Sequence, residues 1–160
     1  MPAPFDPVVI VIAKYAIAIP VLLVAVQVAR RRIFDRDLAE AALGGTLTVG
    51  LVKLGGALYF HQRPFAILHL RPVIAHVADN AFPSDHLAVC GLAVVFLWPR
   101  NRMWCTVAIA GAVLLGFARV LAKLHWPADV VGGFTFGAVA ALLAAAVLNH
   151  LWPRSTPGET

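Results

Sequence analysis

The chain has 160 residues, of which 61% are apolar and only 13% are charged, and its formal net charge is +5. Soluble globular domains carry about a quarter charged residues, so this composition excludes a soluble fold with a polar surface and favours a membrane protein. The positive charge does not indicate a nucleic-acid partner, because the basic residues alternate with apolar runs instead of forming one patch. We predict a single membrane-embedded domain over residues 1–160. The sequence carries no signal for an oligomeric state.

Five apolar runs are predicted to cross the membrane, since about 20 apolar residues span a bilayer as a helix. They cover roughly residues 8–29, 40–60, 85–98, 103–122 and 127–152, the third being the shortest. No basic residues precede the first run, so it is predicted to be a retained span and not a cleaved signal peptide. Residues 61–84 have apolar side chains at helical spacing and are predicted to form a short amphipathic segment at the interface. The predicted fold is an all-α membrane bundle of about five to six helices.

The basic residues predict which ends of these helices face the cytoplasm. Lys and Arg collect in short cytoplasmic loops. If the spans alternate in direction, seven arginines after spans one, three and five lie on one side: Arg30, Arg31, Arg32, Arg36, Arg100, Arg102 and Arg154. The opposite, outer side then holds residues 61–84 and 119–127, and these segments carry most of the other ionisable side chains. The sequence therefore predicts a chemical site on the outer face.

The third span opens with Pro83-Ser84-Asp85-His86. A helix N-terminus presents unpaired N–H groups and the positive end of a dipole, so with the Ser84 hydroxyl it can bind an anion. The alternative is that Ser84 only caps the helix, which is the common role of a serine in this position.

The fifth span opens with His125-Trp126-Pro127-Ala128-Asp129. Pro127 suits the first helical position, which puts Asp129 in the first turn and His125 just before it. The carboxylate is then expected to hydrogen-bond one imidazole nitrogen and leave the other free as a nucleophile. The alternative is that Asp129 only complements the helix dipole while His125 is solvated.

Arg63 and Arg119 lie near the outer ends of spans two and four, where they join the two helix starts. This much positive charge fits a phosphate or pyrophosphate, whose oxygens match the guanidinium fork. Lys53 either reaches up to the same anion or extends to lipid headgroups. His86 is predicted to be the general acid beside a neutral His125, with Asp85 as a tuning residue.

No His, Cys or Glu cluster has zinc spacing, and Asp85 with Asp129 is too little to hold Mg²⁺. We therefore expect a reaction that needs neither a metal ion nor another cofactor.

These residues resemble the type-2 phosphatidic acid phosphatase superfamily, whose signature is Lys-x6-Arg-Pro, Pro-Ser-Gly-His and Ser-Arg-x5-His-x3-Asp. The third part matches here from Ala118 to Asp129 with Ala for Ser, and the second matches at residues 83–86 with Asp for Gly. The first matches at Arg63-Pro64, but Gly56 stands where the lysine is expected; Arg71-Pro72 is a less favoured alternative. The resemblance covers roughly residues 53–133.

The resemblance implies a helical membrane bundle and a phosphohistidine mechanism. In it His125 takes the phosphoryl group, His86 protonates the leaving group, and Asp129 orients His125. The phosphate would be held by Arg63, Ser84 and Arg119, with Lys53 in doubt because of Gly56.

The sequence around these motifs is similar to the bacitracin-resistance type of undecaprenyl-pyrophosphate phosphatase. This implies dephosphorylation of undecaprenyl pyrophosphate on the outer face of the bacterial plasma membrane, which recycles the lipid carrier of cell-wall synthesis. The expected partners are a polyisoprenoid or other lipid phosphate and the membrane lipids. Three alternatives remain: a phosphatidylglycerophosphate or phosphatidate phosphatase, a small anion transporter, and a non-catalytic lipid-binding protein.

Overall fold

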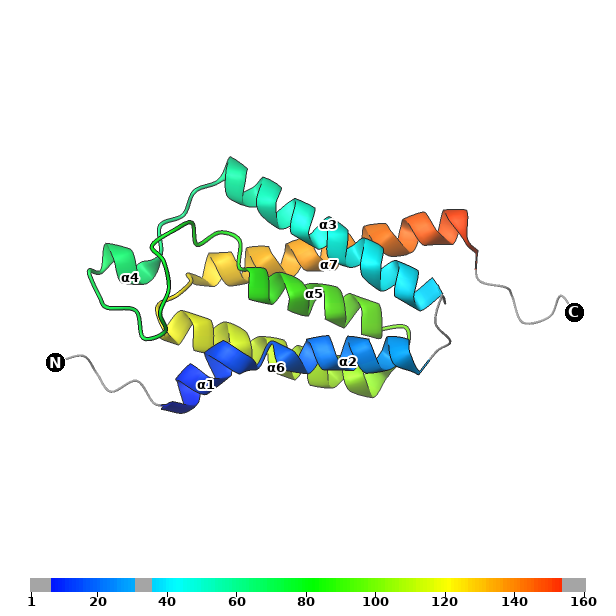
Figure 1. Cartoon of the computed structure of the whole chain (residues 1–160), viewed down its shortest axis with the longest axis horizontal. Helices are drawn as coiled ribbons and strands as arrows, with labels where there is room; N and C mark the ends of the chain where they lie inside the picture. The colour runs from blue at the N-terminus through cyan, green and yellow to red at the C-terminus, as the bar shows by residue number, and fades with distance from the viewer. Residues whose placement is uncertain (1–6, 31–35, 154–160) are drawn as a thin grey trace, which may run out of the picture.

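The computed structural model describes residues 7–30 and 36–153, and its regular elements there are all helices (Figure 1). In chain order they are α1 (Pro7–Tyr15), α2 (Ala18–Ala29), α3 (Arg36–Leu58), α4 (Pro64–Ile67), α5 (Asp85–Leu97), α6 (Arg102–Leu121) and α7 (Pro127–Leu151). Four stretches are long and apolar enough to cross a membrane: Pro7–Ala29, which contains α1 and α2, and the helices α3, α6 and α7. The shorter apolar helix α5 lies among them. The predicted all-α bundle is confirmed, and the chain is a multi-pass membrane protein.

The segment between α3 and α5 differs from the amphipathic helix predicted for it. Apart from the single turn of α4, residues 61–84 have no regular helix. The two ends of the segment are tied together instead, since the N–H of Ala81 donates to the His61 carbonyl at 2.8 Å. The Asn80 amide donates to the carbonyls of Gly56 and Tyr59 at 2.8 and 2.9 Å. Backbone groups paired in this way are not available to an interfacial helix.

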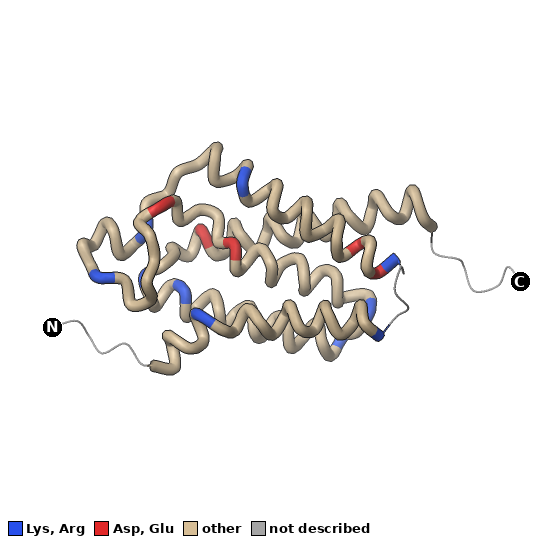
Figure 2. The backbone as a smooth tube through the Cα atoms, viewed as in Figure 1, with Lys and Arg blue, Asp and Glu red and all other residues tan. Residues whose placement is uncertain are grey.

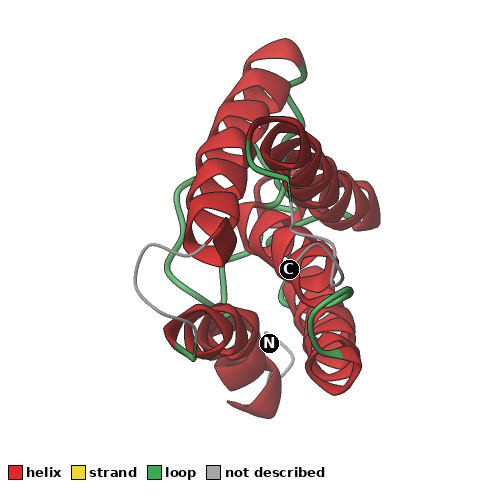
Figure 3. Cartoon of the chain, turned by 90° about the vertical axis from the view of Figure 1, so that its right-hand side faces the viewer, coloured by secondary structure: helices red, strands yellow, loops and turns green. Residues whose placement is uncertain are grey.

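Helix α5 is central, because it packs against α2, α3, α6 and α7. Figure 3 looks along the bundle and shows the helices side by side. The closest approach is between α5 and α7, where glycines let the two backbones meet. A Cβ atom on Gly133 would lie 2.2 Å from the Ser84 carbonyl oxygen, and one on Gly137 would lie 1.7 Å from that of Ala88. This contact sets the N-termini of α5 and α7 beside each other, where the Ser84 N–H donates to the Asp129 carbonyl at 3.0 Å.

The ends of the bundle carry different charged groups (Figure 2). At the end where α2 finishes and α3 and α6 begin, the guanidinium of Arg100 lies 2.9 Å from both Asp37 and Glu40. This pairing joins α3 to the loop between α5 and α6. Arg30, Arg36 and Arg102 lie at the same end, as the topology prediction requires, whereas Arg31, Arg32 and Arg154 lie outside the described residues. The predicted site residues near the starts of α5 and α7 and the end of α6 lie at the opposite end.

Candidate active site

The turn between α6 and α7 brings three of the predicted site residues together. Lys123 has a left-handed backbone (φ 57°), and the Leu124 N–H donates to the Arg119 carbonyl at 3.1 Å, which ends α6 tightly. Leu124 is fully buried in an apolar cluster with Phe65 and anchors the turn. Pro127 then begins α7 at the predicted position. Arg119 from α6 and His125 from the turn therefore face the same space, with Asp129 directly behind them.

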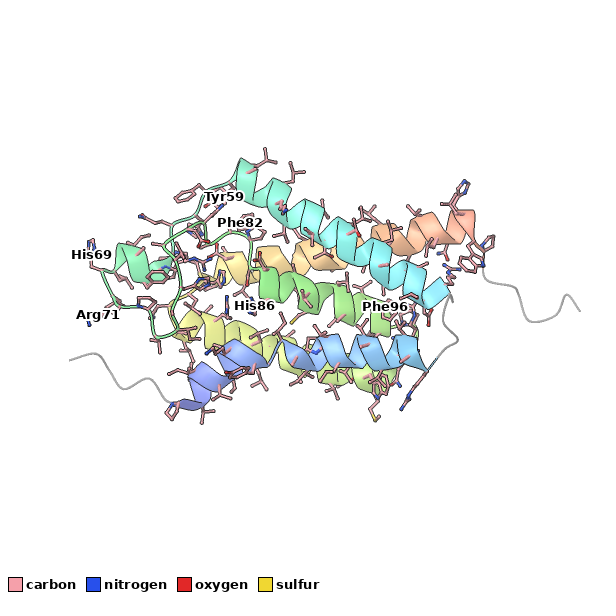
Figure 4. All side chains as sticks on the ribbon, in the orientation of Figure 1. Tyr59, His69, Arg71, Phe82, His86 and Phe96 are labelled. Carbon is pink, nitrogen blue, oxygen red and sulfur yellow. The ribbon has the colours of Figure 1, made fainter. Side chains whose placement is uncertain are left out.

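A cavity of about 310 Å³ lies at this end of the bundle. Five predicted site residues line it: Arg63, Asp85, His86, Arg119 and His125. The other lining residues come from α3 and from the segment before α5: Val52, Gly56, His76, Asp79, Asn80, Phe82 and Pro83. Figure 4 shows His86 at the first turn of α5, near Phe82 and far from Phe96 at the other end of that helix. The fold thus places two histidines, two arginines and one carboxylate that the sequence motifs indicated in one cavity.

The imidazole of His125 is held at both nitrogens. The side chain is only 3% exposed. Its Nδ1 lies 2.9 Å from the Ala81 carbonyl oxygen, and its Nε2 lies 3.1 Å from Nη2 of Arg119. A carbonyl only accepts and a guanidinium only donates, so these partners assign the proton to Nδ1 and the lone pair to Nε2. The unprotonated nitrogen therefore faces Arg119.

The electrostatics of the site keep this imidazole neutral. Burial, with the nearby charges of Arg119 and Arg63, lowers the pKa of His125 from its ordinary value of 6.5 to about 3. The hydrogen bond to Ala81 opposes that shift without cancelling it. Nε2 of His125 thus has a lone pair at neutral pH, as a nucleophile requires.

The lowered pKa of His125 predicts that acid destabilises the folded protein. Between pH 6.5 and about 3 the unfolded chain binds a proton at His125 and the folded protein does not, so stability falls as the pH drops through that window. At pH 5 the loss from this one group is about 2 kcal/mol. Thermal unfolding of the detergent-solubilised protein at pH 7.5 and pH 5 measures it. The His125→Gln variant should lose less stability than the wild type over the same interval, and equal losses would contradict the assignment.

Asp129 is fully buried beside His125 but does not make the predicted hydrogen bond to it. Its Oδ2 lies 3.9 Å from Nδ1 of His125 and accepts the Trp126 N–H at 2.7 Å. Its Oδ1 lies 2.6 Å from Nδ1 of His61. The Ala81 carbonyl, which no sequence motif indicated, takes the orienting position on His125. Asp129 also caps α7, because its side chain accepts from the Trp126 N–H.

The predicted phosphate-binding arginines are buried and already hydrogen-bonded. Nε of Arg63 lies 2.7 Å from Asp79, and its two terminal nitrogens donate to the carbonyls of Leu124 and Asn80 at 3.0 and 3.1 Å. Nη1 of Arg119 donates to the Ala13 carbonyl at 3.3 Å. Arg63 therefore also fixes the loops that enclose the cavity, while Arg119 reaches His125.

Ser84 precedes the first residue of α5 without capping it through its side chain. Its Oγ is buried and has no hydrogen-bond partner in the part of the chain that the structure describes. Ser84 is not among the residues that line the cavity, so its role in phosphate binding remains a prediction.

Two further cavity residues affect the local charge. Asp85 lines the cavity, as expected of a tuning residue. His76, which the sequence did not single out as a site residue, also lines it. Burial and the charges of Arg63 and Arg119 lower the pKa of His76, and the carboxylates of Asp79 and Asp85 oppose that shift. Among the described residues, no group of three His, Cys, Asp or Glu side chains is arranged to hold a metal ion.

Lys53 does not line the cavity, and its predicted contact with the phosphate stays a prediction. Val52 and Gly56, one turn apart on α3, face the cavity, whereas the Lys53 side chain is exposed and does not line it. A Cβ atom on Gly56 would lie 3.3 Å from the Phe82 carbonyl oxygen. The position that carries a lysine in the motif therefore faces the cavity here without any side chain. Arg71, the alternative to Arg63, lies at the tip of the loop, beside His69 (Figure 4).

Replacing Lys53 by Ala is expected to change turnover very little. An exposed side chain away from the cavity contributes less than about 0.5 kcal/mol, which corresponds to a change in kcat/KM of about twofold. Phosphate-release assays on the Lys53→Ala variant measure this effect. A loss of more than about tenfold would show that the lysine contacts the substrate after all.

The sequence profile described as the PAP2 superfamily matches residues 37–153. The chain belongs to the PAP2 superfamily. The resemblance drawn from the three motifs is confirmed. The matched region runs from the second residue of α3 past the end of α7, so it contains every residue that lines the cavity.

Individual PAP2 relatives are similar over part of the chain. The bacitracin transport permease protein BcrC of Bacillus licheniformis is 35% identical over 96 residues, which cover 58% of this chain and 46% of that protein. The undecaprenyl-diphosphatase BcrC of Bacillus subtilis is 27% identical over 140 residues, covering 86% of this chain and 72% of that protein. The alignment thus spans about half the length of the first relative and nearly three quarters of the second.

A solved structure supports the PAP2 fold. It is the crystal structure of the first transmembrane PAP2 type phosphatidylglycerolphosphate phosphatase from Bacillus subtilis. It superposes with a TM-score of 0.66 at 21% identity, over 94% of this chain and 80% of that one.

Proposed function

We propose that this PAP2 protein is a phosphatase that removes the terminal phosphate from undecaprenyl pyrophosphate, giving undecaprenyl phosphate and inorganic phosphate. The observation that carries the proposal is the geometry of His125, whose Nε2 lone pair lies 3.1 Å from the guanidinium of Arg119 in a cavity shared with His86. A nucleophile, a phosphate clamp and a second imidazole are the groups that phosphoryl transfer through histidine needs.

In the first step Nε2 of His125 attacks the terminal phosphorus. The N–P bond forms as the bond from phosphorus to the bridging oxygen breaks, and His86 gives a proton to the departing lipid phosphate. Negative charge on the bound pyrophosphate favours a protonated imidazole at His86. Arg119 exchanges its contact with Nε2 for the phosphoryl oxygens.

The phosphorylated His125 carries positive charge, because Nδ1 keeps its proton. Nδ1–H continues to donate to the Ala81 carbonyl at 2.9 Å, and the Asp129 carboxylate lies 3.9 Å away as a counter-charge. In the second step water attacks phosphorus, His86 accepts the proton from the water, and the N–P bond breaks. Inorganic phosphate leaves, and both histidines return to their starting states.

A lipid substrate is supported by the position of the cavity. It lies at one end of a membrane bundle, and an apolar groove of about 440 Å³ runs along α6 and α7 nearby. The residues that line the groove are all apolar, and at its end Val120 and Pro127 flank the turn that carries His125. A polyisoprenoid chain and a pyrophosphate match these two environments. The name of the Bacillus subtilis relative supports undecaprenyl pyrophosphate as the substrate.

The outward orientation of the site belongs to the same proposal. The cavity lies at the end of the bundle opposite Arg30, Arg36, Arg100 and Arg102. If these arginines mark the cytoplasmic side, the site faces outward from a bacterial plasma membrane.

Phosphate release from defined lipids tests the proposal. The purified protein should hydrolyse undecaprenyl pyrophosphate with a kcat/KM at least about tenfold above that for phosphatidylglycerophosphate or phosphatidate, a difference of about 1.4 kcal/mol. A clear preference for the glycerolipids would contradict the proposed substrate and favour the class that the solved relative's name gives, a phosphatidylglycerolphosphate. Anion flux into liposomes without any phosphate release would instead support a small anion transporter.

A further inference from the structure

His61 contacts Asp129, the carboxylate next to the proposed catalytic histidine His125. Its Nδ1 donates to Oδ1 of Asp129 at 2.6 Å, and the side chain of Asp129 has no exposed surface. The His61 side chain is 27% exposed. It does not line the cavity, so it is not placed to touch a substrate there.

The backbone of His61 joins the same network. Its N–H donates to the Asn80 side chain at 2.8 Å, and its carbonyl accepts the Ala81 N–H at 2.8 Å. The Ala81 carbonyl in turn accepts from Nδ1 of His125. His61 is therefore connected to His125 by two routes, through Asp129 and through Ala81.

Both carboxylate oxygens of Asp129 are bonded away from His125. Oδ1 accepts from His61 and Oδ2 accepts from the Trp126 N–H, so the carboxylate stays 3.9 Å from Nδ1 of His125. At that separation it stabilises positive charge on His125 electrostatically and leaves the hydrogen bond from Nδ1–H to the Ala81 carbonyl in place. A carboxylate released from His61 would be free to turn toward Nδ1.

From this arrangement we infer that His61 is a positioning residue for the nucleophile: it anchors Asp129 so that the carboxylate serves as a counter-charge without drawing Nδ1–H of His125 away from the Ala81 carbonyl that orients the ring. The inference rests on the proposed function for its kinetic consequence, but the anchoring itself is a property of the folded protein. It gives this histidine, which lies two residues before Arg63, a role in the chemical step and none in binding.

A purely structural role for His61 predicts a different pattern of variants. The ring stacks on Trp126 with centroids 6.0 Å apart and lies 5.7 Å from the ring of Tyr59. His61→Phe keeps an aromatic ring and removes the donor. His61→Asn removes the ring and keeps an N–H donor close to the Nδ1 position.

The kinetic experiment compares these two variants with the wild type, with rates expressed per active site from the phosphoenzyme burst. The expected result is that His61→Phe lowers kcat about 10- to 100-fold with KM changed less than about twofold, whereas His61→Asn keeps kcat within about threefold. The control is His69→Phe, on the loop tip, which should match the wild type. The reverse pattern, an active His61→Phe and an impaired His61→Asn, would show that ring stacking matters and would overturn the inference.

A second readout does not depend on turnover. Nitrogen-15 NMR of the histidine side chains reports the protonation of His125 directly. In His61→Phe the released carboxylate should raise the pKa of His125 by about one unit or more, while His61→Asn should leave it unchanged. If the pKa of His125 is the same in the wild type and in His61→Phe, the inference is overturned. If the wild type releases no phosphate but the shift is seen, the proposed function fails and the anchoring role stands.

Discussion

Replacing His125 by Ala is expected to reduce release of phosphate from undecaprenyl pyrophosphate at least about 10⁴-fold, because loss of a nucleophile removes the covalent route. The side chain is buried and makes hydrogen bonds to Ala81 and Arg119, so some loss of stability accompanies the change. Initial rates measured with the protein at the same folded concentration separate the two effects.

Two controls accompany the His125→Ala measurement. Thermal unfolding establishes that the variant is folded at the assay temperature, and His69→Ala, on the exposed loop tip, should keep the wild-type rate. Substantial turnover by folded His125→Ala would show that another group attacks phosphorus, and the proposed mechanism would be wrong.

Replacing Gly137 by Ala is expected to be among the most destabilising single changes in the bundle. Its Cβ would lie 1.7 Å from the Ala88 carbonyl oxygen and 2.9 Å from the Leu92 nitrogen, so α5 and α7 must move apart. Forcing a methyl group into such a contact costs about 3 kcal/mol, the upper part of the usual range for overpacking. The midpoint of thermal unfolding should fall by about 6–12 °C. Activity should fall as well, because the same helix contact sets the spacing between His86 and the turn that carries His125.

Gly50→Ala is the matched control for Gly137→Ala. Gly50 lies within α3, and a Cβ there would meet nothing within 4 Å. Alanine in this position is expected to stabilise the protein by about 0.5–1 kcal/mol through helix propensity. A Gly137→Ala variant as stable as Gly50→Ala would contradict the close helix contact.

The positions of the helices could be predicted because apolar length decides them. The first predicted span, however, contains a break at Ala16 and Ile17, just before Pro20, whose ring has no N–H to donate and crowds the carbonyl of the residue four positions earlier. The segment before α5 was wrongly predicted to be an amphipathic helix. The spacing of apolar residues carries no information about the hydrogen bond that joins Ala81 to His61 across the segment.

The cavity could be predicted in part because its motifs fix residues near helix ends. The cavity is lined, as expected, by Arg63, His86, Arg119 and His125. Lys53 does not line the cavity because Val52 and Gly56 do, and Lys53 is turned by about 100° from Val52 around the helix. The partner of Asp129 was missed because it is 68 residues away, and only the folded loop brings it near. His61 carried one signal, its place two residues before Arg63, but nothing in the sequence indicated its partner.

Trapping the phosphoenzyme is the most direct test of the mechanism. Brief exposure of the protein to undecaprenyl pyrophosphate labelled in its terminal phosphate, followed by a rapid quench in alkali, preserves a phosphohistidine. The mechanism predicts acid-labile label on the peptide that contains His125, formed before phosphate is released and absent from His125→Ala. Phosphate release without label on the protein, or label on another residue, would contradict it.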